Sequence, residues 1–200
     1  TRLKVKTAGD YFLAFTGPIS ENVRTADKRS QVRFFVKKNG STDIPAGNAR
    51  STYVRHNNDH TESSGHMHLL LPSLSANDYI EIYVKSFDSA TENSVKVGTA
   101  TLFLEKIATS RTIFSATGTR LVSGNDLNPD TASSMQWTQE VADSGFTHSN
   151  SSNSHNITLA NAGSYLVFVN VPLSNNRARA SPQLIPKIDG VQVSGGFAAQ

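Results

Sequence analysis

One segment of this chain occurs twice, and it constrains the fold more than any other feature. Ala162–Ser174 repeats the layout of Ala8–Ser20 at an offset of 154 residues, and five of the 13 positions are identical. Each copy has a small turn with glycine, then an apolar run, then a proline, which cannot donate a hydrogen bond to a β-ladder. Each copy therefore predicts a buried strand that ends at its proline, Pro18 or Pro172.

The repeat extends in both directions. Residues 3–5 correspond to residues 157–159 at the same offset, and Phe34–Gly40 resembles Leu184–Gly190 at an offset of 150. This unit is longer than the roughly 20–50 residues of a solenoid repeat, so it indicates a duplicated domain. We expect the chain to open inside one unit of a tandem array and to close inside the next.

The intervening segments predict short strands. In Tyr79–Lys85 the apolar residues alternate with polar ones, which is typical of a strand with one buried face. Gln31–Lys38 is followed by Asn39-Gly40, a strong hairpin signal. No segment has the pattern of an amphipathic helix. Strands at roughly ten-residue spacing predict an all-β sandwich or jelly roll.

Several landmarks follow one another in a recognisable order. They are Trp137 in the expected strand Ser134–Val141, then Ala162–Tyr165 with its apolar run, Gly195-Gly196 after a hairpin, the turn and strand Leu74–Ile82, and the closing segment Gly98–Ile107. Together they resemble C1q/TNF-like domains, which implies an all-β jelly-roll sandwich that trimerises and serves recognition, adhesion or structure. The resemblance is permuted. Residues 1–107 match the later part of a first unit, residues 108–133 are expected to be a linker and unit boundary, and residues 134–200 match the earlier part of a second unit.

A chain that straddles two units leaves both incomplete. Residues 1–107 lack the opening strands that residues 134–159 supply to the second unit, and residues 157–200 lack closing strands. Bare apolar faces and unpaired edges promote aggregation. They could be covered by further ordered chain, by a neighbouring chain that donates strands, or by Trp137–Leu159 folding back onto residues 1–107. We favour the first two, and we expect self-association as a trimer or a polymer.

Composition excludes some classes of partner. The 19 basic and 16 acidic residues give a net charge of +3, and the basic residues are scattered along the sequence, so we expect no nucleic-acid partner. The longest apolar run is far shorter than the roughly 20 residues of a membrane-spanning helix, so we expect no membrane span. An abundance of Ser, Thr, Asn and Gly is typical of extracellular β-proteins. We expect the chain outside the cell, on a cell surface or on a virion.

A group of histidines is the one candidate metal site. His66 and His68 alternate along an expected strand and would share one face, and His60 could complete the set. The alternative is that these are polar residues of a loop and an exposed strand. We expect no other cofactor.

Catalysis has little support in the sequence. The G-x-S-x-G nucleophile motif is absent, and Asp126, Asp130, Glu140 and Asp143 could pair as in glycosidases but are more simply loop acids. The leading hypothesis is a structural or adhesive extracellular protein whose tandem units form a fibre, an appendage or a particle surface. The alternative is a carbohydrate- or receptor-binding module of a virus or phage tail or spike. We predict that the chain is not an enzyme.

Overall fold

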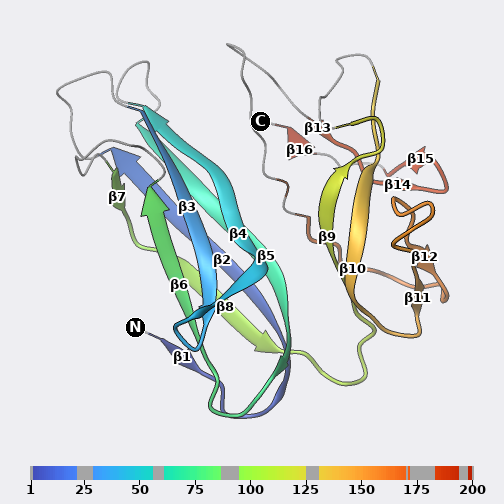
Figure 1. The fold of residues 1–200 in the computed structure, drawn as a ribbon, viewed down its shortest axis with the longest axis horizontal. Helices are drawn as coiled ribbons and strands as arrows, with labels where there is room; N and C mark the ends of the chain where they lie inside the picture. Colours follow the sequence, from blue (N-terminus) through green and yellow to red (C-terminus); the bar gives the residue numbers. More distant parts are fainter. Residues whose placement is uncertain are drawn as a thin grey trace.

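The structure is a computed structural model that describes residues 2–21, 29–55, 61–86, 95–124, 131–169, 171, 183–193 and 198–199. Every regular element within these ranges is a β-strand, and the ladders are antiparallel. The predicted all-β class is confirmed. The strands of the first 106 residues lie together at one side of the view, and the later strands lie at the other side (Figure 1).

Two sheets built from the first half of the chain face each other as a sandwich. Sheet A has the order β1-β6-β3-β4, with bounds Leu3–Lys4, Tyr79–Ser86, Arg29–Lys38 and Thr42–Arg55. In sheet B, β2 is central, with β5 on one edge and both β7 and β8 on the other; their bounds are Gly9–Glu21, Glu62–Leu74, Val95–Val97 and Thr101–Lys106. The two sheets come together at β4 and β5, which are in close contact.

The core lies between the inner faces of these sheets. Because side chains alternate along a strand, every second residue of β2, β3 and β5 is buried. Phe34 of β3 and Phe15 of β2 meet at its centre, with ring centroids 5.1 Å apart. The largest fully buried side chains are Phe34, Leu13, Ile19, Met67, Leu71 and Ile80.

The prediction that the first apolar strand ends at Pro18 is wrong, because β2 continues to Glu21. Strand β8 pairs with residues 11–16 and β7 with residues 19–21, so Pro18 stands between the two neighbours. Its carbonyl accepts a hydrogen bond from the Gly98 amide at 2.9 Å. In an antiparallel strand the N–H and C=O of one residue point to the same side. The position where Pro18 lacks an N–H therefore faces the junction of β7 and β8, and the ladder with β5 loses no hydrogen bond.

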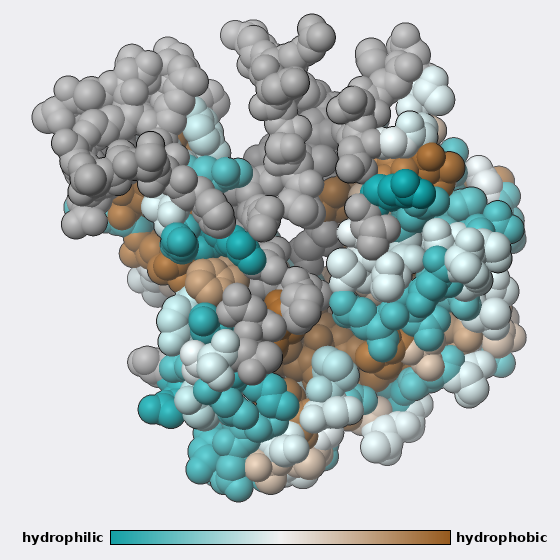
Figure 2. Space-filling view, in the orientation of Figure 1, coloured by the Kyte–Doolittle hydropathy of each residue, from teal (hydrophilic) through white to brown (hydrophobic). Residues whose placement is uncertain are grey.

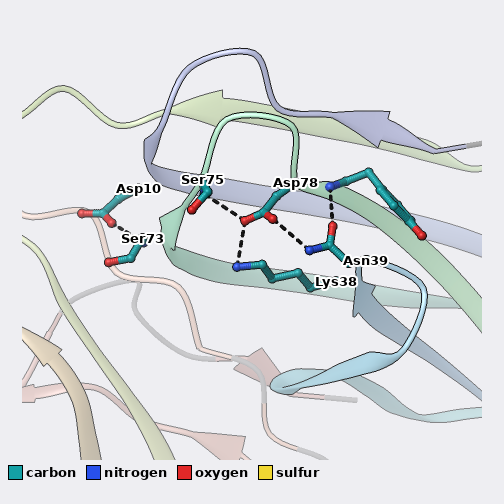
Figure 3. Close-up of polar contacts among 7 residues, drawn as sticks. Asp10, Lys38, Asn39, Ser73, Ser75 and Asp78 are labelled. Carbon is teal, nitrogen blue, oxygen red and sulfur yellow. Dashed lines mark hydrogen bonds and ion pairs between the residues drawn. The ribbon is translucent and has the colours of Figure 1, made fainter.

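The predicted hairpin at Asn39-Gly40 is confirmed, and a polar cluster holds it against the turn before β6 (Figure 3). Asn39 and Gly40 have φ values of 53° and 76°, a conformation that asparagine and glycine tolerate best. The Asn39 amide donates to Asp78 Oδ1 at 2.8 Å, and the Asn39 Oδ1 accepts from the Tyr79 amide at 3.0 Å. Lys38 Nζ lies 2.8 Å from Asp78 Oδ2. One carboxylate therefore joins two turns that are far apart in the sequence.

This cluster makes folding sensitive to acid. Three donors hold the pKa of Asp78 at about 2, below its ordinary value of 3.8; in order of effect they are the Asn39 amide, the Lys38 ammonium group and the Ser75 N–H. Because the folded state favours the carboxylate, the stabilisation is complete above about pH 4 and is lost as the pH falls toward 2. We expect the melting temperature to drop between pH 5 and pH 2.5 by less in Asp78→Asn than in the wild type. Equal drops, measured by circular dichroism, would contradict this assignment.

The second half of the chain forms short strands in two-stranded sheets. The strand β9 (Phe114–Leu121) pairs with β10 (Met135–Ala142), and β11 (Phe146–Thr147) pairs with β12 (Thr158–Leu159). Toward the C-terminus, β13 (Gln183–Leu184) pairs with β16 (Ala198–Ala199), and β14 (Lys187–Ile188) pairs with β15 (Val191–Gln192).

Two features of this half bear on the expectations from sequence. Residues 108–133 were expected to hold a linker and the unit boundary, and the structure forms a strand within them, β9, which is stabilised by its ladder with β10. The fold-back of Trp137–Leu159 onto residues 1–107 was the outcome we did not favour, and among the described residues the one ladder of β10 joins it to β9.

The second copy of the repeated segment also differs from expectation. Residues 162–169 were expected to form a buried strand, but they have no strand conformation and are exposed. Its counterpart β2 is a strand because β5 and β8 flank it. No strand of the described part of the chain pairs with residues 162–169.

Within the described ranges, no helix has the length and apolar character needed to cross a membrane.

Candidate functional site

One side of the sandwich is open, in the sense that no strand of the described residues closes it. Opposite the β4–β5 junction, sheet A ends at β6, whose outer edge pairs with β1 only at residues 79 and 80, and sheet B ends at β8, whose described partner is β2 alone. Val84 on β6 and Leu102 on β8 belong to the inner faces, because they lie opposite the buried residues Phe34 and Phe15. They are nevertheless 47% and 37% exposed. The open side thus has apolar side chains and two strand edges with ladder positions that no strand in the described part of the chain fills.

A second apolar surface is formed by Tyr165–Val169. Leu166 and Val167 are 80% and 73% exposed, whereas Leu13, the counterpart of Val167, is 0% exposed. The same apolar pattern is thus buried in one copy and exposed in the other. Apolar residues reach the surface between the two groups of strands (Figure 2).

The two copies share local geometry despite this difference in burial. The Tyr11 hydroxyl donates to the Thr7 carbonyl at 2.6 Å, and the Tyr165 hydroxyl donates to the Asn161 carbonyl at 2.6 Å. Each bond returns four residues along the chain, as in the tyrosine corners of β-sandwich proteins. The turn at Asp189-Gly190 has φ values of 50° and 79°, close to the 53° and 76° of its counterpart Asn39-Gly40. The second copy therefore shares with the first a tyrosine hydrogen bond before the apolar segment and the geometry of a later turn.

An aromatic residue of the second copy contacts the first sandwich. The Phe168 ring lies 4.7 Å from the Phe12 ring and 4.9 Å from the His68 ring, measured between centroids. Phe12 and His68 are on the outer face of sheet B. Phe168 is still 44% exposed, so this contact covers only part of the segment.

The histidines predicted as metal ligands fall on this same outer face. His66 and His68 flank Met67, which is 1% exposed in the core, so the prediction that they share one face is confirmed. The two ring nitrogens of His66 lie 3.1 Å from the Thr16 hydroxyl and 2.8 Å from the Ser64 hydroxyl. His60 lies outside the described residues, and those that are described contain no group of three or more potential ligands.

A metal site at these histidines stays a prediction with a clear test. A metal ion at His66 must displace the hydroxyl of Thr16 or Ser64. If the prediction holds, His66→Ala weakens Zn²⁺ binding by about tenfold or more in calorimetric titrations of the full chain. His155→Ala, a change in the second half of the chain, is the control. Equal Zn²⁺ affinity in the wild type and in His66→Ala would contradict the prediction.

The acidic residues considered for catalysis have contacts that tie them to the backbone or to hydroxyls. Glu140 accepts hydrogen bonds from Thr117 and Ser115, on the strand opposite. Asp143 accepts a hydrogen bond from the Ile113 amide at 2.7 Å. Asp126 and Asp130 lie outside the described residues. Glu140 and Asp143 therefore stabilise the pairing of β9 with β10 and the backbone next to it.

Sequence reasoning missed one surface, the outer face of sheet A. Aromatic and basic side chains gather there from residues 2–4, 33–37 and 79–85. The sequence shows that these side chains alternate with apolar ones along each strand. Only the register of the sheet shows that they lie together on one face. Compared with protein-family models and with curated proteins, the chain has no match.

Proposed function

We propose that this chain is a structural or adhesive protein, displayed outside the cell, whose β-sandwich units associate through unpaired strands. One observation carries the proposal: residues 165–169 repeat the apolar pattern of a core strand, but Leu166 and Val167 are 80% and 73% exposed. Exposed apolar segments of this kind usually mark a site of association. The proposal assigns the chain no catalytic role.

The covering element we propose is a strand from another copy of this chain. In the first unit, β2 is covered by ladders with β5 and β8. The open side offers suitable edges, since β8 and most of β6 have ladder positions to spare within the described chain. Strand addition at a sheet edge gains backbone hydrogen bonds and buries alternate side chains. Repeated from copy to copy, it builds a trimer if the contact closes and a fibre if it does not.

The arrangement of the first unit supports the finer fold proposal. Two antiparallel sheets with non-sequential strand orders, β1-β6-β3-β4 and β5-β2-β8, are the kind of arrangement found in jelly rolls. The shared tyrosine hydrogen bond and the shared turn geometry support the proposal that a C1q/TNF-like unit is present in tandem.

Sedimentation velocity and electron microscopy of the 200-residue protein test the proposed function. We expect a concentration-dependent increase in mass and either closed trimers or filaments. A protein that stays monomeric up to about millimolar concentration would overturn the proposal, since specific interfaces normally form below that range.

A second candidate function is a carbohydrate- or receptor-binding module of a virus or phage tail or spike. Tyr53 and Tyr83, on the outer face of sheet A, favour it because they are 41% and 40% exposed. Exposed aromatic residues next to cations are common in recognition surfaces.

A further inference from the structure

The central strand of sheet B, β2, has apolar side chains on both of its sides. Tyr11, Leu13 and Phe15 are buried in the core. Phe12 and Ala14 alternate with them and lie on the outer face of the sheet. A strand with one face in water alternates apolar and polar residues, whereas a continuous apolar run is typical of a strand covered on both faces. The sequence of β2 therefore predicts a further layer on the outer face of sheet B.

The neighbouring strands extend this apolar surface. The β2–β5 ladder places Leu70 opposite Phe12, and the β2–β8 ladder places Phe103 opposite Ala14. Phe103 is 52% exposed. We call the set Phe12, Ala14, Leu70 and Phe103 the outer patch. A contiguous apolar patch on the outer face of a sheet usually marks an interaction surface.

The outer patch carries little charge. Among the described outward side chains that these two ladders place around it, Glu105, opposite Phe12, is the one carboxylate, and none is a lysine or an arginine. Arg111 Nη2 lies 3.9 Å from Glu105 Oε1 and offsets part of its charge. Two such patches can therefore approach each other with little repulsion between like charges, which a contact between identical faces requires.

The second copy of the repeat has the same two-sided apolar character. Leu166 and Phe168 are the counterparts of Phe12 and Ala14 at the offset of 154, so they occupy outward positions and both are apolar. The Phe168 ring lies 4.7 Å from the Phe12 ring. An outward residue of one copy thus packs on an outward residue of the other, which shows that this face accepts its own counterpart.

The contact within the chain leaves part of the patch uncovered. Phe168 lies toward β5, where its ring is also 4.9 Å from that of His68. Phe103 is on β8, at the opposite side of β2, and about half of its side chain is exposed. The β8 side of the patch is therefore the part that another molecule can cover.

We propose that the outer face of sheet B is a contact between two molecules of this chain, in which the two outer patches pack face to face. The contact is isologous, because each molecule contributes the same residues. It goes beyond the proposed function, since it uses a sheet face instead of a strand edge and does not require residues 165–169 to find partner strands. Where strand addition builds trimers or fibres, this contact joins two of them side by side.

Cross-linking of single-cysteine variants tests the contact. The chain has no cysteine, so each variant reacts at one known site. Thr101→Cys introduces a thiol on the outer face of sheet B and leaves the outer patch intact. With bismaleimide linkers of about 10–20 Å, one to two sheet spacings, it should form covalent dimers at least about tenfold faster than Tyr53→Cys, a control on the outer face of sheet A. Equal rates in the two variants would overturn the proposal.

A substitution in the patch tests the same contact by affinity. Phe103→Asp should raise the dissociation constant of the face contact at least about tenfold in sedimentation velocity, because it places a carboxylate in an apolar interface. Tyr53→Asp is the matched control, since Tyr53 is also an exposed aromatic residue, and it should change this constant by less than about twofold. Circular dichroism checks that both variants are folded. Equal weakening in both variants would contradict the proposal.

Val167→Asp separates this inference from the proposed function. Val167 is the counterpart of the inward residue Leu13, so its replacement should block strand completion and leave the outer patch unchanged. Cross-linking through Thr101→Cys should persist in this background, and its loss would overturn the inference. If trimers or filaments form but Thr101→Cys reacts no faster than Tyr53→Cys, the face contact is wrong and strand completion stands. If Thr101→Cys forms covalent dimers and nothing larger assembles, strand completion is wrong and the face contact stands.

Discussion

Replacing Phe34 by alanine is expected to lower the free energy of unfolding of the first sandwich by about 3–5 kcal/mol. Phe34 is 1% exposed and packs against Phe15 at the centre of the core. The two rings also crowd the backbone of Gly17, where a Cβ atom would come within 2.7 Å of both. A domain of ordinary stability has only about 5–15 kcal/mol in total, so this one truncation should leave the sandwich close to unfolding.

Chemical denaturation followed by far-ultraviolet circular dichroism measures this effect. Phe103→Ala is the matched control, because Phe103 is 52% exposed on β8 and should cost less than about 1 kcal/mol. Similar losses in the two variants would mean that the two sheets do not share the core described above.

The double variant Leu166→Asp/Val167→Asp is expected to abolish self-association. The counterparts of these residues are Phe12 and Leu13 of β2, and the latter is fully buried. Burying an unpaired carboxylate in an apolar contact is strongly unfavourable. The concentration at half association should therefore rise by at least about hundredfold, which corresponds to roughly 2.8 kcal/mol. Sedimentation velocity measures this shift.

Ile188→Asp/Val191→Asp provides the control for this experiment. These two residues are 62% and 70% exposed, so the apolar character lost from the surface is comparable. Their counterparts at the offset of 150 are Lys38 and Ser41, which are polar, so the proposed assembly does not place them in a contact. Loss of association in both double variants would indicate nonspecific apolar aggregation.

The sequence predicted best where local pattern and burial agree. The alternation in Tyr79–Lys85 corresponds to β6, and Asn39-Gly40 turns as expected because its positive φ values suit those two residues. β9 was missed because residues 114–121 have few periodic apolar positions, and their pairing with β10, not their own pattern, makes them a strand. The strand end predicted at Pro18 was wrong because β7 and β8, whose junction accommodates the proline, come from segments far away in the sequence.

The surfaces were harder to predict than the strands. The shared face of His66 and His68 follows from alternation alone. The basic face of sheet A does not, because Lys4, Arg33 and Lys85 are far apart in the sequence and become neighbours through the order β1-β6-β3. The exposure of residues 165–169 was also missed, because a sequence pattern shows that a segment suits burial but not whether a partner strand is present.

Amide hydrogen exchange of residues 165–169, compared with residues 11–15, tests most directly whether the second copy is a core strand without its neighbours. In dilute solution we predict slow exchange in residues 11–15, which are paired on both sides, and fast exchange in residues 165–169. On association, residues 165–169 should become protected while residues 11–15 do not change. If the protein assembles and residues 165–169 still exchange freely, the contact lies elsewhere and the proposed strand completion is wrong.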